Sequence, residues 1–426
     1  MSKVVVSPAK SFSLNISNIA PDKSISHRSV MFAMLADGTS EIENFLRAED
    51  TLNSLEIIKN LGAEVEDDGD IIKISSNGIK ESFEVLDCGN SGTGMRLFCG
   101  LLSSANGHFV LTGDKYLRSR PMKRVTLPLR DIGAKLDGRN SGDLAPLSIR
   151  GASLNAFNYE SKIASAQVKS AMILAALRAE GICTYTEPEL SRDHTERMLK
   201  GMGANIEVDG LTTTIEPLKE LLSPLKIRVP ADPSSAFFFA VAAAITPNSN
   251  IVLEGVTLNP TRIESFKALE KMGANISYEV TDNKYEPIGN ISVKYAPLKA
   301  ISIENNISWL IDELPALSIA MACADGESIV KNAEELRVKE SDRISTVVKG
   351  LLSCGIEVYE YKDGYKIVGS EFKKARIDSD GDHRIAMSFI IAGLKSGMEV
   401  TDLECINTSF PNFFELLEKI TKVEFL

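Results

Sequence analysis

The chain has 426 residues, of which 44% are hydrophobic, and it carries 47 Lys and Arg against 58 Asp and Glu, a net charge of −11. This length allows two or three domains. The acidic balance argues against a nucleic-acid or anionic-membrane surface, because those partners need a broad basic face. The six cysteines lack C-x-x-C spacing and mostly lie in apolar runs, which is typical of reduced core thiols in a cytoplasmic protein. No signal peptide or membrane span is expected, and the four histidines lack metal-ligand spacing.

The predicted elements begin with a strand over residues 3–16, after which one unit repeats along the chain. In each unit a helix ends in an apolar residue followed by Gly. These glycines are 70 or 71 residues apart except for a last interval of 82, and they are Gly62, Gly133, Gly203, Gly273 and Gly355. A Gly after a helix predicts a C′ position with positive φ. A fixed period of this length predicts a duplicated supersecondary unit.

Each unit is predicted to run strand, helix, strand, helix, strand, turn, strand. Most units have an earlier helix stop, at Gly38, Gly107, Gly181, Gly326 and Gly397. Asp-Gly pairs at 68–69, 209–210 and 363–364 predict the turns of the closing hairpins. The segment 417–423 resembles a sixth copy that lacks its Gly and ends after one strand.

The two helices of a unit differ in pattern. The first is apolar on nearly every side, as in residues 171–177, 236–242 and 385–391, and is therefore expected inside a core. The second keeps a polar stripe and is expected nearer solvent. Together with the strands, these helices predict an α/β fold.

Six units exceed one compact core, so two groups of three are expected. A Pro-interrupted linker, 229–233, follows the third unit, and a second crossing is expected near residues 20–21. The predicted N-terminal domain is 20–229, with repeats 1–3. The predicted C-terminal domain is 1–19 plus 230–426, with repeats 4–6, and the strand over 3–16 completes the truncated sixth unit. Two adjacent crossings predict a hinge, with ligand bound between the domains.

Cationic side chains cluster where the helices open, at 22–28, 117–121, 337–343 and 382–384, and a Gly-rich turn opens another helix at 89–94. A helix N-terminus offers free N–H groups and positive potential, so added Lys or Arg makes an anion site. Several such sites predict a multiply charged small molecule. The Gly-rich turn has G-x-x-G-x-G spacing, which differs from the dinucleotide fingerprint.

The ordered set of motifs resembles the enolpyruvyl transferases, in the branch that acts on shikimate 3-phosphate, over essentially the whole chain. The matching segments are Asp22-Lys23-Ser24-Ile25-Ser26-His27-Arg28, Gly89 to Arg96, Arg120-Pro121-Met122, Ala164-Ser165-Ala166-Gln167, Ser191-Arg192-Asp193-His194, Ile311-Asp312-Glu313, Leu336 to Arg343 and Gly381 to Arg384. The resemblance implies a two-domain inside-out α/β barrel, with three βαβαββ repeats in each domain and a hinged ligand cleft between them.

The activity implied by the resemblance is transfer of the enolpyruvyl group of phosphoenolpyruvate to the 5-hydroxyl of shikimate 3-phosphate. The reaction is an addition followed by an elimination that releases phosphate, in aromatic amino acid biosynthesis, and glyphosate inhibits it. No cofactor and no metal are expected. The expected partners are the two small anionic substrates, with no nucleic acid and no membrane, and a monomer is expected.

Residue roles are also implied by the resemblance. Asp312 and Glu340 are expected to move protons at the hydroxyl and at the methylene, and Lys23 to stabilise the transferring group. The residues expected to bind phosphoenolpyruvate are Lys23, Asn90, Gly92, Arg120, Gln167, Arg343 and Arg384. Those expected to bind shikimate 3-phosphate are Lys23, Ser24, Arg28, Ser165, Ala166, Gln167, Arg192, Asp312 and Lys339.

The chain departs from the family pattern at two positions. Many members carry a Lys before the Phe-Pro pair, where this chain has Thr408 and Ser409, so that cation is missing or supplied elsewhere. Ala166 stands where other members have a second Ser. Gly94 and Arg192-Asp193-His194 resemble the second class of this branch.

Two other functions remain as alternatives. The sister branch of enolpyruvyl transferases acts on UDP-N-acetylglucosamine, but it uses a Lys-Asn pair where this chain has Lys23-Ser24. A binding protein without turnover would gain nothing from Asp312 and Glu340, because carboxylates weaken an anion site. A polymer-binding scaffold is disfavoured by the net acidity.

Overall fold

Six four-stranded sheets are formed by the residues that the computed structural model describes, 3–283 and 285–426, and all six share one pairing pattern. The first strand pairs parallel with the second, and the remaining two follow antiparallel, as in the sheet of residues 158–215. A parallel pair needs a crossover connection. In four of the sheets a helix supplies it directly. The six sheets confirm the sixfold repeat predicted from the glycine spacing.

The N-terminal unit comprises residues 21–229, together with Tyr285 and Glu286 of a distant loop. Its sheets, in spatial order, are β14 (Lys226–Arg228), β3 (Thr39–Glu43), β5 (Ile71–Ser75) and β4 (Glu64–Asp67); β6 (Leu86–Asp87), β7 (His108–Thr112), β9 (Leu144–Arg150) and β8 (Lys135–Gly138); and β10 (Asn158–Glu160), β11 (Cys183–Thr186), β13 (Thr212–Ile215) and β12 (Ile206–Asp209). Its helices are α1 (Lys23–Ala33), α2 (Glu49–Asn60), α3 (Gly92–Leu102), α4 (Lys123–Asp131), α5 (Arg139–Gly142), α6 (Ala166–Ala176) and α7 (His194–Gly201), with the 3₁₀ turn η1 (Leu117–Ser119).

The C-terminal unit comprises the residues up to Ala20 and residues 230–283 and 287–426. Its sheets are β2 (Ser13–Ile16), β15 (Asn250–Thr257), β17 (Ile288–Lys294) and β16 (Asn275–Asp282); β18 (Ser302–Ile303), β19 (Glu327–Val330), β21 (Gly364–Val368) and β20 (Glu357–Tyr361); and β22 (Ala375–Asp378), β23 (Met398–Thr401), β1 (Lys3–Val6) and β24 (Val423–Phe425). Its helices are α8 (Pro233–Ile245), α9 (Glu264–Lys271), α10 (Ile307–Leu310), α11 (Leu314–Ala322), α12 (Arg343–Ser353), α13 (His383–Ser396) and α14 (Phe413–Leu417), with η2 (Glu334–Val338) and η3 (Glu404–Thr408).

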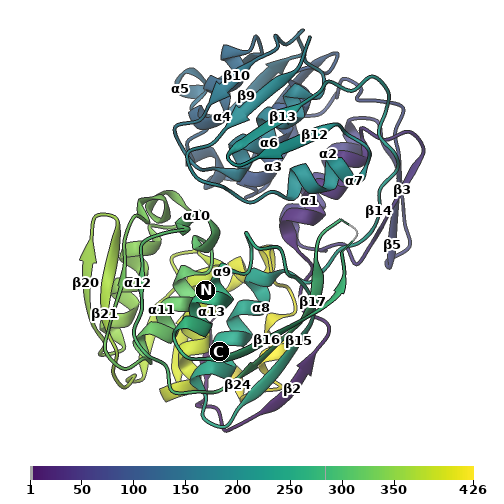
Figure 1. The fold of residues 1–426 in the computed structure, drawn as a ribbon. Coiled ribbons are helices and arrows are strands. Elements are labelled where there is room, and N and C mark those ends of the chain that lie inside the picture. Colours follow the sequence, from purple (N-terminus) through teal and green to yellow (C-terminus); the bar gives the residue numbers. More distant parts are fainter. Residues whose placement is uncertain (1–2, 284) are drawn as a thin grey trace. The chain divides into compact units, whose positions relative to one another are not determined.

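Helices, rather than sheets, form the centre of each unit. In the N-terminal unit α3 contacts both α1 and α6, and in the C-terminal unit α8, α11 and α13 contact one another. Figure 1 shows the C-terminal unit's strands β20–β21 and β15–β17 on opposite sides of these three helices. Every residue of α8 and α11 is buried. A helix that is apolar all round loses no solvated face on burial, so the inside-out arrangement predicted by the resemblance is confirmed.

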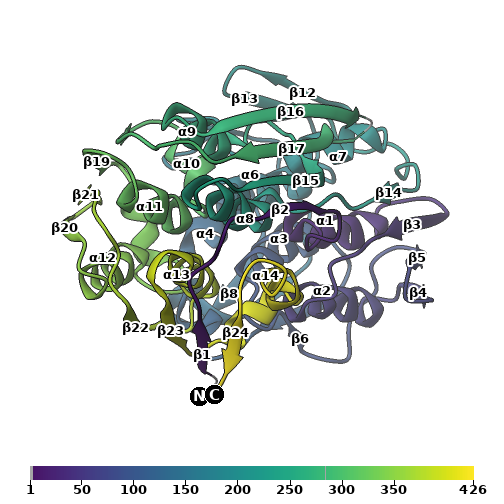
Figure 2. The same cartoon turned by 90° about the horizontal axis from the view of Figure 1, so that it is seen from below.

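The strand predicted over residues 3–16 is wrong as a single element. It is two short strands, with Pro8 between them, because a proline lacks the N–H needed to continue a ladder. β1 pairs with β23 and β24 and completes the sixth sheet, as Figure 2 shows near the two chain ends. β2 instead pairs parallel with β15 in the fourth sheet.

The first sheet is completed by a strand from the far end of its unit. β14, residues 226–228, pairs parallel with β3, residues 39–43. In the first and fourth sheets, therefore, the parallel pair is formed by strands from distant parts of the chain, β14 with β3 and β2 with β15. The sequence period alone does not reveal this pairing, because it fixes spacing and not strand partners.

The five helix-ending glycines predicted to have positive φ all have it, with values from 78° to 108°. The turn predicted at Asp363-Gly364 is wrong by one residue. Gly364 lies in β21, paired with Tyr361, so the hairpin turn is formed by Lys362 and Asp363. A Cβ at position 364 would lie 2.0 Å from the Val330 carbonyl oxygen, so close packing of strands, not turn geometry, requires this Gly.

Among the described residues, no helix is both long and apolar enough to span a bilayer. All six cysteines are free thiols, and four of them are buried.

Candidate active site

Lys23 is held at the start of the first helix of the N-terminal unit. The Asp22 side chain caps α1 by accepting from the Ile25 N–H at 2.9 Å, so Lys23 is the first helical residue. Its Nζ lies 2.5 Å from Oδ2 of Asp50, whose side chain is only 4% exposed. Asp50 was not predicted, because nothing in its local sequence marks it. The pairing fixes the ammonium at a helix N-terminus, where positive potential is already concentrated.

Arg28 lies one turn further along α1 and is 3% exposed. Its Nε donates to Thr195 Oγ1 at 2.8 Å and its Nη2 to Ser170 Oγ at 2.9 Å. Its Nη1 donates to the Ser24 carbonyl oxygen at 3.0 Å. These partners come from α7, α6 and α1, so three helices fix one guanidinium. These hydroxyl and carbonyl partners orient the guanidinium without bringing a negative charge to it.

His27 connects α1 to the Gly-rich turn. Its Nδ1 lies 2.8 Å from Ser54 Oγ and its Nε2 lies 3.1 Å from Ser91 Oγ. Ser91 caps α3 by accepting from the Gly94 N–H. Burial lowers the pKa of His27 well below its usual value, and the charges of Lys23 and Arg28 lower it further. The imidazole is therefore neutral at physiological pH.

The Gly-rich turn brings several predicted ligands together. Arg120 Nη2 donates to Asn90 Oδ1 at 2.6 Å, and its Nη1 lies 3.3 Å from the Asn90 carbonyl oxygen. Arg96, which was not predicted as a ligand, donates from Nη1 to Gln167 Oε1 at 2.5 Å. A Cβ on Gly92 would lie 3.0 Å from Arg96 Nη1 and 3.3 Å from Arg120 Nη1. Gly92 therefore lets two guanidinium groups approach the first turn of α3.

The remaining predicted residues of this unit lie at the N-terminal ends of α6 and α7. Ser165 precedes α6 without capping it through its side chain, and Ala166 is the first helical residue. Gln167 also donates to Thr93 Oγ1 at 2.9 Å, which joins α6 to α3. Arg192 is half-buried in the segment just before α7. Five helix openings of this unit thus carry predicted ligands.

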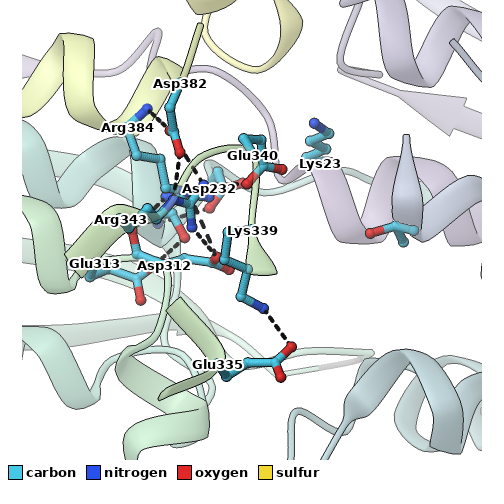
Figure 3. A network of polar contacts seen from close by, with 12 residues as sticks. Lys23, Asp232, Asp312, Glu313, Glu335, Lys339, Glu340, Arg343, Asp382 and Arg384 are labelled. Atoms are coloured by element: carbon cyan, nitrogen blue, oxygen red, sulfur yellow. Dashed lines mark hydrogen bonds and ion pairs between the residues drawn. The ribbon is translucent and has the colours of Figure 1, made fainter. Parts of the chain in front are cut away.

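Arg343 is the centre of the polar network in the C-terminal unit (Figure 3). It is 1% exposed, and its Nη2 donates to Glu340 Oε2 at 2.5 Å. Its Nη1 donates to Asp312 Oδ1 at 3.3 Å. Both predicted proton-transfer residues, 31 and 3 positions away in sequence, therefore contact the same guanidinium.

Asp382 is the third carboxylate on Arg343, and it was not predicted as a site residue. Its Oδ2 accepts from Arg343 Nε at 2.8 Å, and its Oδ1 accepts from the Arg384 N–H at 2.9 Å, which caps α13. Burial raises the pKa of Asp382, but the charge and hydrogen bond of Arg343, together with the charge of His383, hold this pKa below its usual value. Burial lowers the pKa of Arg343, but the surrounding carboxylates raise it above its usual value, and Asp382 contributes most to this rise. Although Asp382 lies in the motif 381–384, an Asp before a helix is typical of an N-cap, so the sequence did not mark Asp382 as a site residue.

Arg384 and Lys339 are held differently. Arg384 Nη1 donates to the Asp312 carbonyl oxygen at 3.2 Å, so it contacts the same loop that carries a predicted acid. Lys339 Nζ lies 3.3 Å from Glu335 Oε1, and its side chain is 24% exposed. Burial lowers the pKa of Lys339, although Glu335 opposes this.

Neither predicted acid is a helix cap. α11 begins after Glu313, and α12 is capped by Asp342, whose side chain accepts from the Ser345 N–H. Helix capping therefore does not explain the positions of Asp312 and Glu340. At the position of the missing Lys, Thr408 Oγ1 donates to the Cys405 carbonyl oxygen at 2.7 Å within η3.

Among the described residues, no group of three or more His, Cys, Asp or Glu side chains has the arrangement of a metal site.

Comparison with known proteins decides the family. The sequence profile described as EPSP synthase (3-phosphoshikimate 1-carboxyvinyltransferase) matches residues 8–417. This chain belongs to the EPSP synthase family. It is 80% identical to a 3-phosphoshikimate 1-carboxyvinyltransferase of Sulfurimonas denitrificans, over 100% of this chain and 99% of that protein. It is 66% identical to the Nitratiruptor protein of the same name, with the same coverage.

Solved structures agree with this assignment. An EPSP synthase structure from Acinetobacter baumannii superposes on this chain with a TM-score of 0.89, at 39% identity and with complete coverage of both chains. A second structure of the Acinetobacter enzyme gives a TM-score of 0.88. Both the two-domain α/β fold and the resemblance to the enolpyruvyl transferases are thus confirmed.

Proposed function

We propose that the two units divide the work of the EPSP synthase reaction between charge capture and proton transfer. The chain catalyses the reaction of its family: the enolpyruvyl group of phosphoenolpyruvate is transferred to the 5-hydroxyl of shikimate 3-phosphate, and phosphate is released. The N-terminal unit supplies most of the ligands for the anionic groups. The C-terminal unit supplies the two acids. Turnover therefore requires both units.

In the N-terminal unit, cations and hydrogen-bond donors hold the substrates. Shikimate 3-phosphate is bound by Lys23, Ser24, Arg28, Ser165, Gln167 and Arg192, with the Ala166 backbone and with Asp312 and Lys339 of the other unit. Phosphoenolpyruvate is bound by Lys23, Asn90, Gly92, Arg120 and Gln167, with Arg343 and Arg384. The buried, helix-anchored guanidinium of Arg28 supports this assignment, because a preorganised fork matches the oxygens of a phosphate.

Proton transfer belongs to Asp312 and Glu340. The methylene carbon of phosphoenolpyruvate takes a proton from Glu340 while the acceptor hydroxyl, which gives its proton to Asp312, adds to the neighbouring carbon. In the elimination, the methyl carbon returns a proton to Glu340, the bond from the neighbouring carbon to phosphate breaks as the double bond re-forms, and the phosphate leaves with the proton held by Asp312. The observation that carries this assignment is that one buried guanidinium, Arg343, contacts both acids and so fixes their positions relative to each other.

Lys23 stabilises charge on the transferring and departing groups. Its position at the first turn of α1 adds an ammonium to the positive end of a helix. Lys339 acts on the acceptor from the other unit.

We also propose that the functional domains are residues 20–229 and residues 1–19 plus 230–426, and that the protein works as a cytoplasmic monomer. The free cysteines and the net charge of −11 support a reducing compartment and argue against a nucleic-acid partner. Light scattering of the purified protein should give the mass of one chain, and a dimer mass would contradict this.

The function is tested by measuring phosphate release with each substrate alone and with both together. Release is expected only when phosphoenolpyruvate and shikimate 3-phosphate are both present, and it should be unaffected by a chelator. UDP-N-acetylglucosamine in place of shikimate 3-phosphate should give none. Release with the nucleotide sugar alone as acceptor would assign the chain to the sister activity instead.

A further inference from the structure

A buried ionic cluster outside the proposed set of ligands lies in the N-terminal unit, between α6, β11 and α7. Its centre is Lys169, on α6, which is 1% exposed. Its Nζ lies 2.7 Å from Glu187 Oε1, 2.8 Å from Glu196 Oε1 and 3.3 Å from the Ser191 carbonyl oxygen. An ammonium has three N–H donors. Each of them therefore has an acceptor, and the acceptors come from three successive parts of the chain.

The cluster closes a loop that leads directly to a proposed ligand. Glu187 follows β11, and its Oε1 also accepts from the Ser191 N–H at 3.0 Å. Lys169 and Glu187 thus bind the backbone of Ser191 from both its carbonyl and its N–H. Arg192 is the next residue. The Lys169 and Glu187 side chains therefore fix the backbone of the residue directly before Arg192.

The neighbouring residues make a second, parallel connection between the same helices. Ser170 follows Lys169 on α6, and Thr195 precedes Glu196 on α7. The Ser170 Oγ lies 2.7 Å from the Thr195 Oγ1, and both hydroxyls accept hydrogen bonds from Arg28. The Ser170–Thr195 connection holds one proposed ligand of shikimate 3-phosphate. The Lys169–Glu196 connection, one residue away on each helix, holds the loop of another.

The composition of the cluster is costly for stability alone. One ammonium faces two carboxylates, and in the described part of the chain the second oxygens, Glu187 Oε2 and Glu196 Oε2, are buried without a hydrogen-bond partner. Burial raises the pKa of Glu196, and Lys169 only partly opposes this. Apolar residues of similar volume commonly stabilise a fold as well as a buried ion pair does. A cluster of this composition is therefore better explained by the geometry that it imposes.

We propose that Lys169, with Glu187 and Glu196, is a positioning group for Arg192 and so for binding of shikimate 3-phosphate. This inference rests on the role proposed above for Arg192. Lys169 itself does not touch substrate. Its removal is expected to release the 187–191 loop, to raise KM for shikimate 3-phosphate and to leave KM for phosphoenolpyruvate nearly unchanged.

The test compares Lys169→Met with Lys200→Met, the same change on an exposed position of α7. Lys169→Met should raise KM for shikimate 3-phosphate about tenfold or more, the cost expected for a misplaced charged hydrogen bond. KM for phosphoenolpyruvate should change less than about twofold. Lys200→Met should alter neither, and Lys169→Arg should restore most of the acceptor affinity. Equal rises in the two KM values, or a lower kcat with both unchanged, would overturn the proposal.

Because Lys169→Met leaves two buried carboxylates unpaired, it can impair folding. The triple variant Lys169→Met, Glu187→Gln, Glu196→Gln leaves no charge in the cluster, so it is expected to fold, as circular dichroism and thermal unfolding will show. It should reproduce the selective rise in KM for shikimate 3-phosphate. A folded triple variant with unaltered acceptor KM would contradict the positioning role.

Combining Lys169→Met, or the triple variant, with Arg192→Ala tests the positioning role of the cluster separately from the ligand role proposed for Arg192. If the cluster acts through Arg192, its loss should add little to the KM of Arg192→Ala. Additive effects would mean that the cluster does not act through Arg192. An Arg192→Ala variant with normal acceptor KM would instead refute the assigned role of Arg192.

Discussion

Arg28 of the N-terminal unit and Arg343 of the C-terminal unit are held by different kinds of partner. Arg28 donates to the hydroxyls of Ser170 and Thr195 and to a carbonyl oxygen, whereas Arg343 donates to three carboxylates. Hydroxyl partners orient a guanidinium without adding a negative charge. Carboxylate partners bring acids together around the guanidinium. The first arrangement suits substrate capture, and the second suits proton transfer.

The largest expected effect breaks the C-terminal arrangement. Glu340→Gln and Asp312→Asn should each lower kcat by about 10² to 10⁴, because a positioned proton-transfer group contributes that much, while KM changes little. Steady-state kinetics measures both. Glu371→Gln, on an exposed loop of the same unit, is the control and should have normal kcat. A variant at 312 or 340 with wild-type kcat removes that residue from the mechanism.

A smaller effect is expected from removing a proposed phosphoenolpyruvate ligand of the N-terminal unit. Arg120→Ala removes a guanidinium held by Asn90 and should weaken phosphoenolpyruvate binding about tenfold to a hundredfold, the range for lost charged hydrogen bonds. Isothermal calorimetry in the presence of shikimate 3-phosphate measures this affinity. Arg118→Ala changes an exposed arginine two residues earlier and should bind normally. Normal affinity in Arg120→Ala would count against its role as a ligand.

In the N-terminal unit, the neutral His27 is expected to make the free energy of unfolding depend on pH. Because burial and two cations depress its folded-state pKa, the unfolded chain binds a proton below about pH 6.5 that the folded chain does not. The free energy of unfolding should therefore decrease by about 1.4 kcal/mol per pH unit as pH falls below this value, until the folded-state pKa is reached. Urea unfolding between pH 5 and 7.5 measures the slope.

The control for this prediction is a pair of variants. His27→Asn should flatten the pH dependence, whereas His108→Gln, at a half-buried position in β7, should leave it in place. An unchanged slope in His27→Asn would mean that another group causes the acid sensitivity.

The smallest effect is expected from adding a methyl group at Gly92, between the guanidinium groups of Arg96 and Arg120. In Gly92→Ala the new methyl group would meet the ends of Arg96 and Arg120, which are flexible and can move by a few tenths of an ångström. Stability should change by less than about 1 kcal/mol, and KM for phosphoenolpyruvate should rise a few-fold. Inhibition by glyphosate should weaken more than phosphoenolpyruvate binding. Equal loss for both ligands in a steady-state inhibition assay would refute this prediction.

The sequence predicted the periodic parts of the fold well and the long-range pairings poorly. The glycines at 62 and 133 reveal helix ends because a positive φ is a local requirement. By contrast, the predicted strand over 3–16 is two strands in two different sheets, since alternating residues specify a strand without specifying its partner. Asp50 was missed for the same reason: its function depends on Lys23, which lies 27 positions earlier.

By itself, the sequence determined the sixfold repeat, the all-round apolar helices and the family of the chain, because spacing, composition and ordered motifs are properties of the chain alone. Only the tertiary structure decided which charges meet. Arg343 contacts Asp312, Glu340 and Asp382, which are up to 39 residues away, and Lys169 joins two carboxylates and a backbone carbonyl. Hydrogen bonds act over about 3 Å, so they depend on which elements pack together, and no local pattern encodes that packing.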